Sequence, residues 1–209
     1  MAKNFNFDLV AISKFFDLAY NENCAHLQQW LQADFELDAF EQRIVNDLYE
    51  EIVESGEYMN EEELKTQMVS LAFYAANVKV KKKIKVFYER AMTGIIKEMP
   101  LSVICDCLIA TPRINAPDTP YFFLQEFKKS KGEKKDPEAQ MLVAMLIAQA
   151  KNNDEKPIYG GYLIGTGWHF TTLIGNDYCV SKKYEATTKE SLIAIIYALK
   201  KLKDLILNR

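Results

Sequence analysis

The sequence lacks the segments that would direct it into or across a membrane. No run of about twenty apolar residues occurs in its 209 residues, so we expect no transmembrane helix. The opening residues, MAKNFNFDLV, lack the basic-then-apolar layout of a signal peptide. We therefore expect a cytoplasmic protein without a membrane partner.

Cysteine is also scarce, and the four that occur show none of the spacings of a zinc site: Cys24, Cys105, Cys107 and Cys179. Cys105 and Cys107 flank a single residue of one expected strand, and neighbours placed in this way rarely form a disulfide. We therefore expect all four cysteines to be reduced and buried, as is usual in the cytosol.

The composition provides for a substantial core, and the charge is unevenly distributed. Hydrophobic residues make up 49% of the chain, and its length suits one large domain or a domain with an appendage. Residues 1–65 hold fifteen Asp or Glu against four Lys or Arg, a net charge of −11, and the remainder carries +8. This asymmetry indicates either a polyanion partner for the basic part or a simple segregation of surface charge by helix.

The periodicity of apolar residues divides the chain into two parts. In residues 1–57 apolar positions recur at intervals of three and four, which predicts helices. After the gap SGEYMN, Asn60 and Glu63 have the spacing of a capping box for a helix reaching about Ala76. We divide the chain into an acidic helical N-terminal extension, residues 1–58, and a second domain, residues 59–209.

The second domain alternates strands and helices. Residues 78–100 predict one or two strands at a sheet edge, because lysines blunt such edges. Two further strands are expected at about 102–110 and 120–129, joined by a Pro-rich loop in which residues 117–120 form a turn. The resulting order is helix, three strands, helix, strands, helix.

Capping signals mark the two later helices. Asp136 followed by Pro137 predicts the start of a helix that is apolar nearly all round and therefore buried. Short strands separated by glycine turns follow, with Gly165–Gly167 as a hairpin turn. Thr187 and Glu190 predict a capping box for a last helix that reaches Leu207.

Charged residues interrupt the two apolar strands before the buried helix. If these strands form a hairpin folded near Asn115, Asp106 lies across from about Glu126, and like charges directly opposite destabilise a sheet. A divalent cation between the two carboxylates would remove the conflict. Lys128, one pleat beyond Glu126, would add a second positive charge.

This pattern, an Asp followed twenty residues later by Glu-x-Lys, resembles the PD-(D/E)XK nuclease superfamily. The resemblance covers about residues 60–209 and includes the order of elements. It implies a restriction-endonuclease-like α/β (α+β) fold, in which a central mixed β-sheet is flanked by helices. The literal Pro-Asp of the motif name occurs at Pro117-Asp118, so Asp118 is the alternative to Asp106.

The resemblance also implies an activity. Asp106 and Glu126 would bind Mg²⁺, with Mn²⁺ as a substitute, and Lys128 would orient water or stabilise the transition state. The implied reaction is hydrolysis of a phosphodiester in nucleic acid, DNA rather than RNA, leaving 5′-phosphate and 3′-hydroxyl ends. Many such nucleases act as homodimers.

Two further residues are candidates for the site by the same resemblance. Family members often carry a glutamate on the helix before the sheet, and of Glu61, Glu62 and Glu63 we choose Glu61 because it shares a helical face with core residues. All three would equally suit the helix dipole. Gln140, on the buried helix, would contact the site or the nucleic acid, or else form a structural hydrogen bond.

Several remaining residues have a structural interpretation and a functional one. His26 and His169 have no nearby ligand residues and are interpreted as structural or surface groups. Trp168 is expected in the core rather than stacked on a base. Six lysines are solvated singly and would together form a basic rim: Lys129, Lys131, Lys134, Lys135, Lys182 and Lys183.

A different class of function fits the same residues. The chain could be a nucleic-acid-binding or protein-interaction module that keeps the fold without cleaving. Metal-dependent cleavage of DNA would distinguish the enzyme from this alternative.

Overall fold

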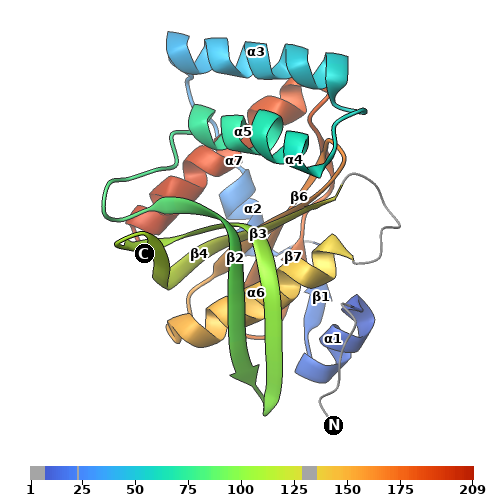
Figure 1. Cartoon of the computed structure of the whole chain (residues 1–209), viewed down its shortest axis with the longest axis vertical. Coiled ribbons are helices and arrows are strands. Elements are labelled where there is room, and N and C mark those ends of the chain that lie inside the picture. The colour runs from blue at the N-terminus through green and yellow to red at the C-terminus, as the bar shows by residue number, and fades with distance from the viewer. Residues whose placement is uncertain (1–7, 23, 129–135) are drawn as a thin grey trace.

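A computed structural model of the chain describes residues 8–22, 24–128 and 136–209 (Figure 1). Within them, a mixed β-sheet with strand order β1-β7-β6-β5-β4-β3-β2 is flanked by helices, and β8 pairs with β6. The strands are β1 Ala19–Asn21, β2 Lys85–Ile96, β3 Met99–Arg113, β4 Ala116–Lys128, β5 Ile158–Ile164, β6 Gly167–Ile174, β7 Asp177–Val180 and β8 Tyr184–Glu185. The chain is therefore a mixed α/β protein, as the sequence predicted.

The central strands follow the expected order of connections. β2, β3 and β4 form an antiparallel meander, and β4 pairs in parallel with β5 through the crossover helix α6, Pro137–Asn152. β5, β6 and β7 continue antiparallel, and β2 lies at one edge of the sheet, as its lysines indicated.

Helices cover both faces of the sheet (Figure 1). On one face, α6 packs with α1 (Leu9–Phe16) against a cluster that includes Leu108, Leu124 and Leu173. On the other face, a second cluster includes Trp30, Phe123 and Phe170. Its helices are α2 Ala25–Leu31, α3 Ala39–Ser55, α5 Ser70–Ala75 and α7 Lys189–Leu207.

The predicted caps of two helices are confirmed. Asp136 Oδ1 accepts from the backbone N–H of Glu138 at 2.9 Å and starts α6, whose residues 139–148 are all buried. Asn60 and Glu63 form the reciprocal capping box of α4, Glu61–Glu63. The chain continues through a π-helical stretch, Leu64–Val69, into α5, so one continuous helical segment holds Glu61 above the sheet.

The expectation that residues 1–57 are wholly helical is wrong at β1. Ala19–Asn21 pairs in parallel with β7 and extends the sheet by one strand. Three exposed residues carry no alternation that could reveal such a strand, because its partner lies far along the chain. This early part also packs on the later part, since Trp30 Nε1 donates to the carbonyl of Ala198 at 2.8 Å.

Two local predictions are corrected. Residues 117–120 belong to β4, with Pro117 opposite Pro112 and Asp118 opposite Thr111 across an irregular register, so the turn lies earlier, at Ile114 and Asn115. The last helix begins one residue later than expected, with Thr188 rather than Thr187 as its N-cap. Thr188 Oγ1 donates to the carbonyl of Glu185, so no side-chain capping box forms.

The expectation that all four cysteines are reduced is also wrong. Cys24 and Cys179 form a disulfide with a Cα–Cα distance of 6.3 Å, whereas Cys105 and Cys107 are free and buried. The pair is 155 residues apart in sequence and is brought together because Asn21 of β1 lies opposite Cys179 of β7.

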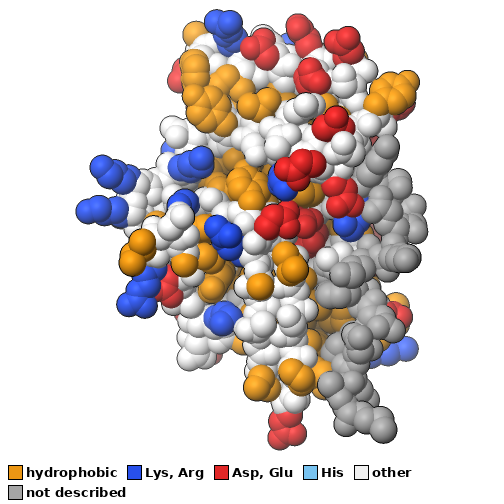
Figure 2. Space-filling view, in the orientation of Figure 1, with side chains coloured by type: hydrophobic (Ala, Val, Ile, Leu, Met, Phe, Trp, Pro, Cys, Tyr) orange, Lys and Arg blue, Asp and Glu red, His pale blue; other side chains and the backbone are white. Residues whose placement is uncertain are grey.

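The surface shows the charge asymmetry of the sequence. In Figure 2, acidic side chains gather over the part of the molecule where α3 and α4 lie, and basic side chains gather where the chain enters β2. Among the described residues, no helix is both long and apolar enough to cross a bilayer.

Candidate active site

The sheet forks between β3 and β4, and the two predicted metal ligands lie at the fork. β3 pairs with β4 only as far as Cys107 opposite Gln125, and beyond this point β3 pairs with β2 alone. Continuing this register places Asp106 level with Glu126, as expected, although a regular hairpin from Arg113 and Ala116 would not do so without the register shifts between Ile109 and Thr111. Asp106 Oδ2 accepts from the backbone N–H of Phe127 at 3.0 Å, so a carboxylate takes the place of the missing ladder bond.

The carboxyl groups of Asp106 and Glu126 interact directly. They lie close enough for a hydrogen bond between them when one is protonated. Burial and the charge of Asp106 raise the pKa of Glu126 well above its usual range. The pKa of Asp106 is also raised by burial, although its hydrogen bond from Phe127 opposes the shift.

Glu126 is the one acidic or basic side chain among the described residues that is fully buried. Neither of its carboxyl oxygens makes a well-aligned hydrogen bond among those residues, and the groups near enough to bond them are the carboxyl group and backbone N–H of Asp106. Buried oxygens without partners are rare, because each forfeits its bonds to water. Two adjacent carboxylates, one of them buried with poorly satisfied oxygens, suit a hard divalent cation, which prefers oxygen ligands.

Lys128 connects the fork to the helical segment above it. Its Nζ donates to Glu61 Oε1 at 2.9 Å. Its positive charge opposes, without reversing, the rise in the pKa of Asp106 and of Glu126 that burial causes. The contact from the helix comes from Glu61 rather than from its neighbours. Glu62 pairs with Lys65, and Glu63 completes the capping box. Glu61, Asp106, Glu126 and Lys128 are thus brought together from three elements.

Gln140 lies on the first turns of α6, which packs on β4. Its side chain is only 7% exposed, and its Oε1 has no hydrogen-bond partner among the described residues. No described contact joins it to Asp106 or Glu126. The structure therefore places a buried amide oxygen, without a hydrogen-bond partner among the described residues, on the helix that follows the Glu-x-Lys strand.

Glu89 is an acidic neighbour that the sequence did not reveal. It lies on β2 between Tyr88, opposite Cys107, and Arg90, opposite Cys105, which places it beside Asp106. Its φ of 51° is in the left-handed region, which is rare for a non-glycine residue inside a strand. Its charge adds to burial in raising the pKa of Asp106.

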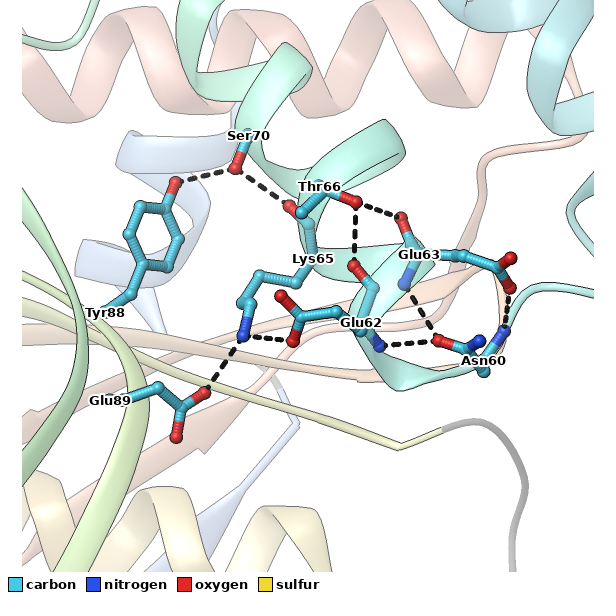
Figure 3. A network of polar contacts seen from close by, with 8 residues as sticks. All are labelled: Asn60, Glu62, Glu63, Lys65, Thr66, Ser70, Tyr88 and Glu89. Atoms are coloured by element: carbon cyan, nitrogen blue, oxygen red, sulfur yellow. Dashed lines mark hydrogen bonds and ion pairs between the residues drawn. The ribbon is translucent and has the colours of Figure 1, made fainter.

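Figure 3 shows how Glu89 is tied to the helical segment. Lys65 Nζ lies 3.3 Å from Glu89 Oε1 and also pairs with Glu62. Above this pair in the view, the hydroxyls of Ser70 and Tyr88 are 2.9 Å apart. The register between β2 and β3 depends on the turn at Lys97 and Glu98, which no sequence signal assigned, so Glu89 could not be placed beside Asp106 beforehand.

Asp118, the alternative acidic residue, lies away from the fork. It is eight residues before Glu126 on β4, a separation of about 26 Å in an extended strand. Its carboxylate lies 3.6 Å from Arg113, and it is partly exposed. Asp118 cannot share an ion with Glu126.

Of the six lysines of the expected basic rim, the structure describes two, Lys182 and Lys183. Lys129, Lys131, Lys134 and Lys135 lie outside the described residues. Lys183 pairs with Glu185 at 2.9 Å. Lys182 lines a cavity of about 620 Å³ near the edge of the sheet that is opposite to β2.

Both histidines and Trp168 have distinct surroundings. His169 lines the same cavity and stacks on Tyr162 with ring centroids 4.6 Å apart, and burial lowers its pKa. Trp168 is 1% exposed and belongs to the core, as expected. His26 lies 3.4 Å from Cys24 Sγ.

Comparisons with known proteins identify no relative. Neither a scan of protein-family models nor a search of curated proteins found a match for this chain.

Proposed function

We propose that this protein is a metal-dependent nuclease that hydrolyses phosphodiester bonds of DNA at the fork between β3 and β4. One observation carries the proposal. The carboxyl groups of Asp106 and Glu126 lie together, and the fully buried Glu126 has no well-aligned hydrogen bond and only Asp106 beside its oxygens among the described residues. Packing alone gives no reason to hold two acidic groups in this way, because each opposes ionisation of the other.

The order and pairing of the strands support a restriction-endonuclease-like core as part of the proposal. A helical segment leads into an antiparallel meander, a crossover helix follows β4, and β5 returns parallel to β4. The acidic pair lies on the second and third of these strands, and the lysine lies two residues after Glu126.

In this proposal Asp106 and Glu126 bind Mg²⁺ or Mn²⁺ through their carboxylate oxygens. The chemistry that such an ion supplies is a lowered pKa for a water molecule and stabilisation of the charge that builds on the phosphate. Lys128 orients the attacking water or stabilises that charge, since its ammonium lies near both carboxylates. Glu61 holds Lys128 in position through the 2.9 Å hydrogen bond.

The test is cleavage of linear and circular duplex DNA and of single strands, in Mg²⁺, in Mn²⁺ and in EDTA. We expect cleavage only with a metal, and a loss of roughly 100-fold or more in Glu126→Gln and Asp106→Asn. Asp118→Asn is the matched control, because it removes a carboxylate from the same strand far from the fork. It should cleave as the wild type does.

The alternative is a module that binds nucleic acid without cutting it. A wild-type protein that binds duplex DNA but leaves it intact in both metals would establish the alternative and refute the nuclease. Binding that does not weaken as salt is added would argue against any phosphate-backbone partner.

A further inference from the structure

Three metal-ligating side chains meet at the edge of the sheet opposite β2. They are Cys24, which is the N-cap of α2, His26 on the first turn of α2, and Cys179 on β7. One ligand atom from each lies within 4.8 Å of the others. The cluster is separate from the acidic fork, which lies between β3 and β4.

The position of His26 is not explained by the disulfide. A disulfide between Cys24 and Cys179 needs no imidazole, yet His26 Nε2 lies 3.4 Å from Cys24 Sγ. In a tetrahedral zinc site with ordinary Zn–S and Zn–N bond lengths, the distance between a sulfur and a nitrogen ligand is about 3.5 Å. The distance between His26 Nε2 and Cys24 Sγ therefore matches that between two ligands of one zinc ion.

We propose that, once the disulfide is reduced, Cys24, His26 and Cys179 bind one Zn²⁺ ion. Two thiolates and one imidazole form a Cys₂His set, which suits zinc and leaves a fourth position for water or an added ligand. Cys179 is buried, whereas Cys24 and His26 are half-buried, so the open position lies toward the solvent side.

The surroundings supply groups that orient such ligands. Thr172 Oγ1 lies 4.0 Å from Cys24 Sγ. Asp177 supplies a carboxylate two residues before Cys179 on β7. Carboxylates near a ligating histidine commonly accept its second ring N–H and fix the orientation of the ring.

The disulfide form and the zinc-bound form interconvert by reduction followed by metal binding. A dithiol reductant gives two electrons and two protons to the disulfide and becomes a cyclic disulfide, leaving two thiols on the protein. Zinc binding then releases the two thiol protons to solvent. Either state links α2 to β7 across 155 residues, through a sulfur–sulfur bond in one case and through the metal in the other.

The experiment uses the whole chain, reduced with a dithiol and freed of it under anaerobic conditions, then titrated with Co²⁺ as a spectroscopic probe. We expect thiolate-to-cobalt absorption that saturates at one ion per chain and is abolished by one equivalent of Zn²⁺. The oxidised protein should show no such absorption, and Mg²⁺ should not compete.

Variants distinguish the cluster from adventitious binding. His26→Ala should weaken Co²⁺ binding at least about tenfold, and Cys24→Ser should remove most of the absorption. His169→Gln, which replaces the other histidine, should bind as the wild type does. His26→Ala retains both cysteines, so its ability to form the disulfide on oxidation reports that the fold is intact.

Two results would overturn the proposal. One is a reduced wild-type protein that shows no thiolate-to-cobalt absorption. The other is absorption that is equally strong in His26→Ala and His169→Gln. Neither result depends on nuclease activity, so the zinc site and the proposed function are tested separately.

Discussion

Lys128 Nζ lies 2.9 Å from Glu61 Oε1, and this hydrogen bond joins the last residue of β4 to a helix that begins 67 residues earlier. The lysine side chain is 16% exposed and the glutamate side chain 42% exposed. A pair this close to solvent contributes little to stability. Its significance is therefore positional, since it fixes the ammonium beside Asp106 and Glu126.

Glu61→Gln should separate positioning from stability. Because the pair is partly exposed, we expect a loss of less than about 1 kcal/mol in the free energy of unfolding. DNA cleavage should fall at least roughly tenfold through kcat, because Lys128 loses its charged partner. Glu62→Gln makes the same change of charge one residue away, where the partner is Lys65. Equal activities in the two variants would argue against a role for Glu61.

Glu126→Gln should be more stable than the wild type at neutral pH and not at acid pH. Burial and the Asp106 charge raise the pKa of Glu126 well above its usual range, so the folded state retains a proton there. The stability gained from this proton is complete below the unfolded pKa of about 4.3 and is lost as the pH rises through the folded pKa.

The glutamine stays neutral, so it avoids that loss. We expect a gain in the free energy of unfolding at about pH 8 that shrinks to nearly zero at about pH 4, because below the unfolded pKa both states of the wild type are protonated. Denaturant unfolding at both values measures the difference. Asp118→Asn controls for the change in formal charge on the same strand. A gain that is the same at both pH values would contradict the assignment of Glu126 as a buried carboxyl group.

Divalent metal should stabilise the wild type through the same residue. At about ten times its Kd, an ion that binds only the folded state adds about 1.4 kcal/mol, or about 3–6 °C in Tm for a chain of this size. We expect this rise with Mn²⁺ in the wild type and its absence in Glu126→Gln. The protein should be kept in its disulfide form, which occupies both cysteines of the Cys₂His cluster. A rise in both proteins would place the ion elsewhere.

Gly160→Ala tests how closely α6 approaches the sheet. A Cβ at Gly160 would lie 2.6 Å from Met141 Sδ and 2.7 Å from Thr171 Oγ1, closer than packing allows. We expect a loss of roughly 1–3 kcal/mol, measured by denaturant unfolding. Gly94→Ala is the matched control, because its Cβ would make only ordinary contact with Ile147, at 3.4 Å. A loss of stability in Gly160→Ala no larger than that in Gly94→Ala would show that the side chains of Met141 and Met145 move aside at little cost.

The sequence predicted the elements whose determinants are local. Asp136 starts a helix because its side chain bonds the second residue after it, and Asn60 with Glu63 does the same for α4. The turn of the β3–β4 hairpin lies near Asn115, as expected, but a regular ladder from Arg113 and Ala116 would place Asp106 across from Phe123. Register shifts between Ile109 and Thr111 move the pairing by three residues, and they bring Asp106 level with Glu126. The caps span a few residues and were predictable, whereas the register shifts carry no local signal.

The features that escaped prediction depend on distant partners. β1 consists of three exposed residues whose pairing with β7 spans most of the chain. The same pairing creates the Cys24–Cys179 disulfide, which no cysteine spacing reveals. Glu89 lies beside Asp106 through the β2–β3 register, which is set by the turn at Lys97 and Glu98, and its left-handed backbone conformation is one that a glutamate rarely adopts. Each arises from tertiary context rather than from a local pattern.

The position of β1 also bears on how the protein can be handled. This short strand covers the outer edge of β7 with backbone hydrogen bonds. Trimming the chain past Asn21 would leave unpaired the outer-edge amides and carbonyls of β7 that now bond to β1, while its pairing with β6 would remain. A bare strand edge invites a strand from a neighbouring molecule. Shortened versions should therefore self-associate, and an affinity tag is better placed after Arg209 or ahead of an intact α1.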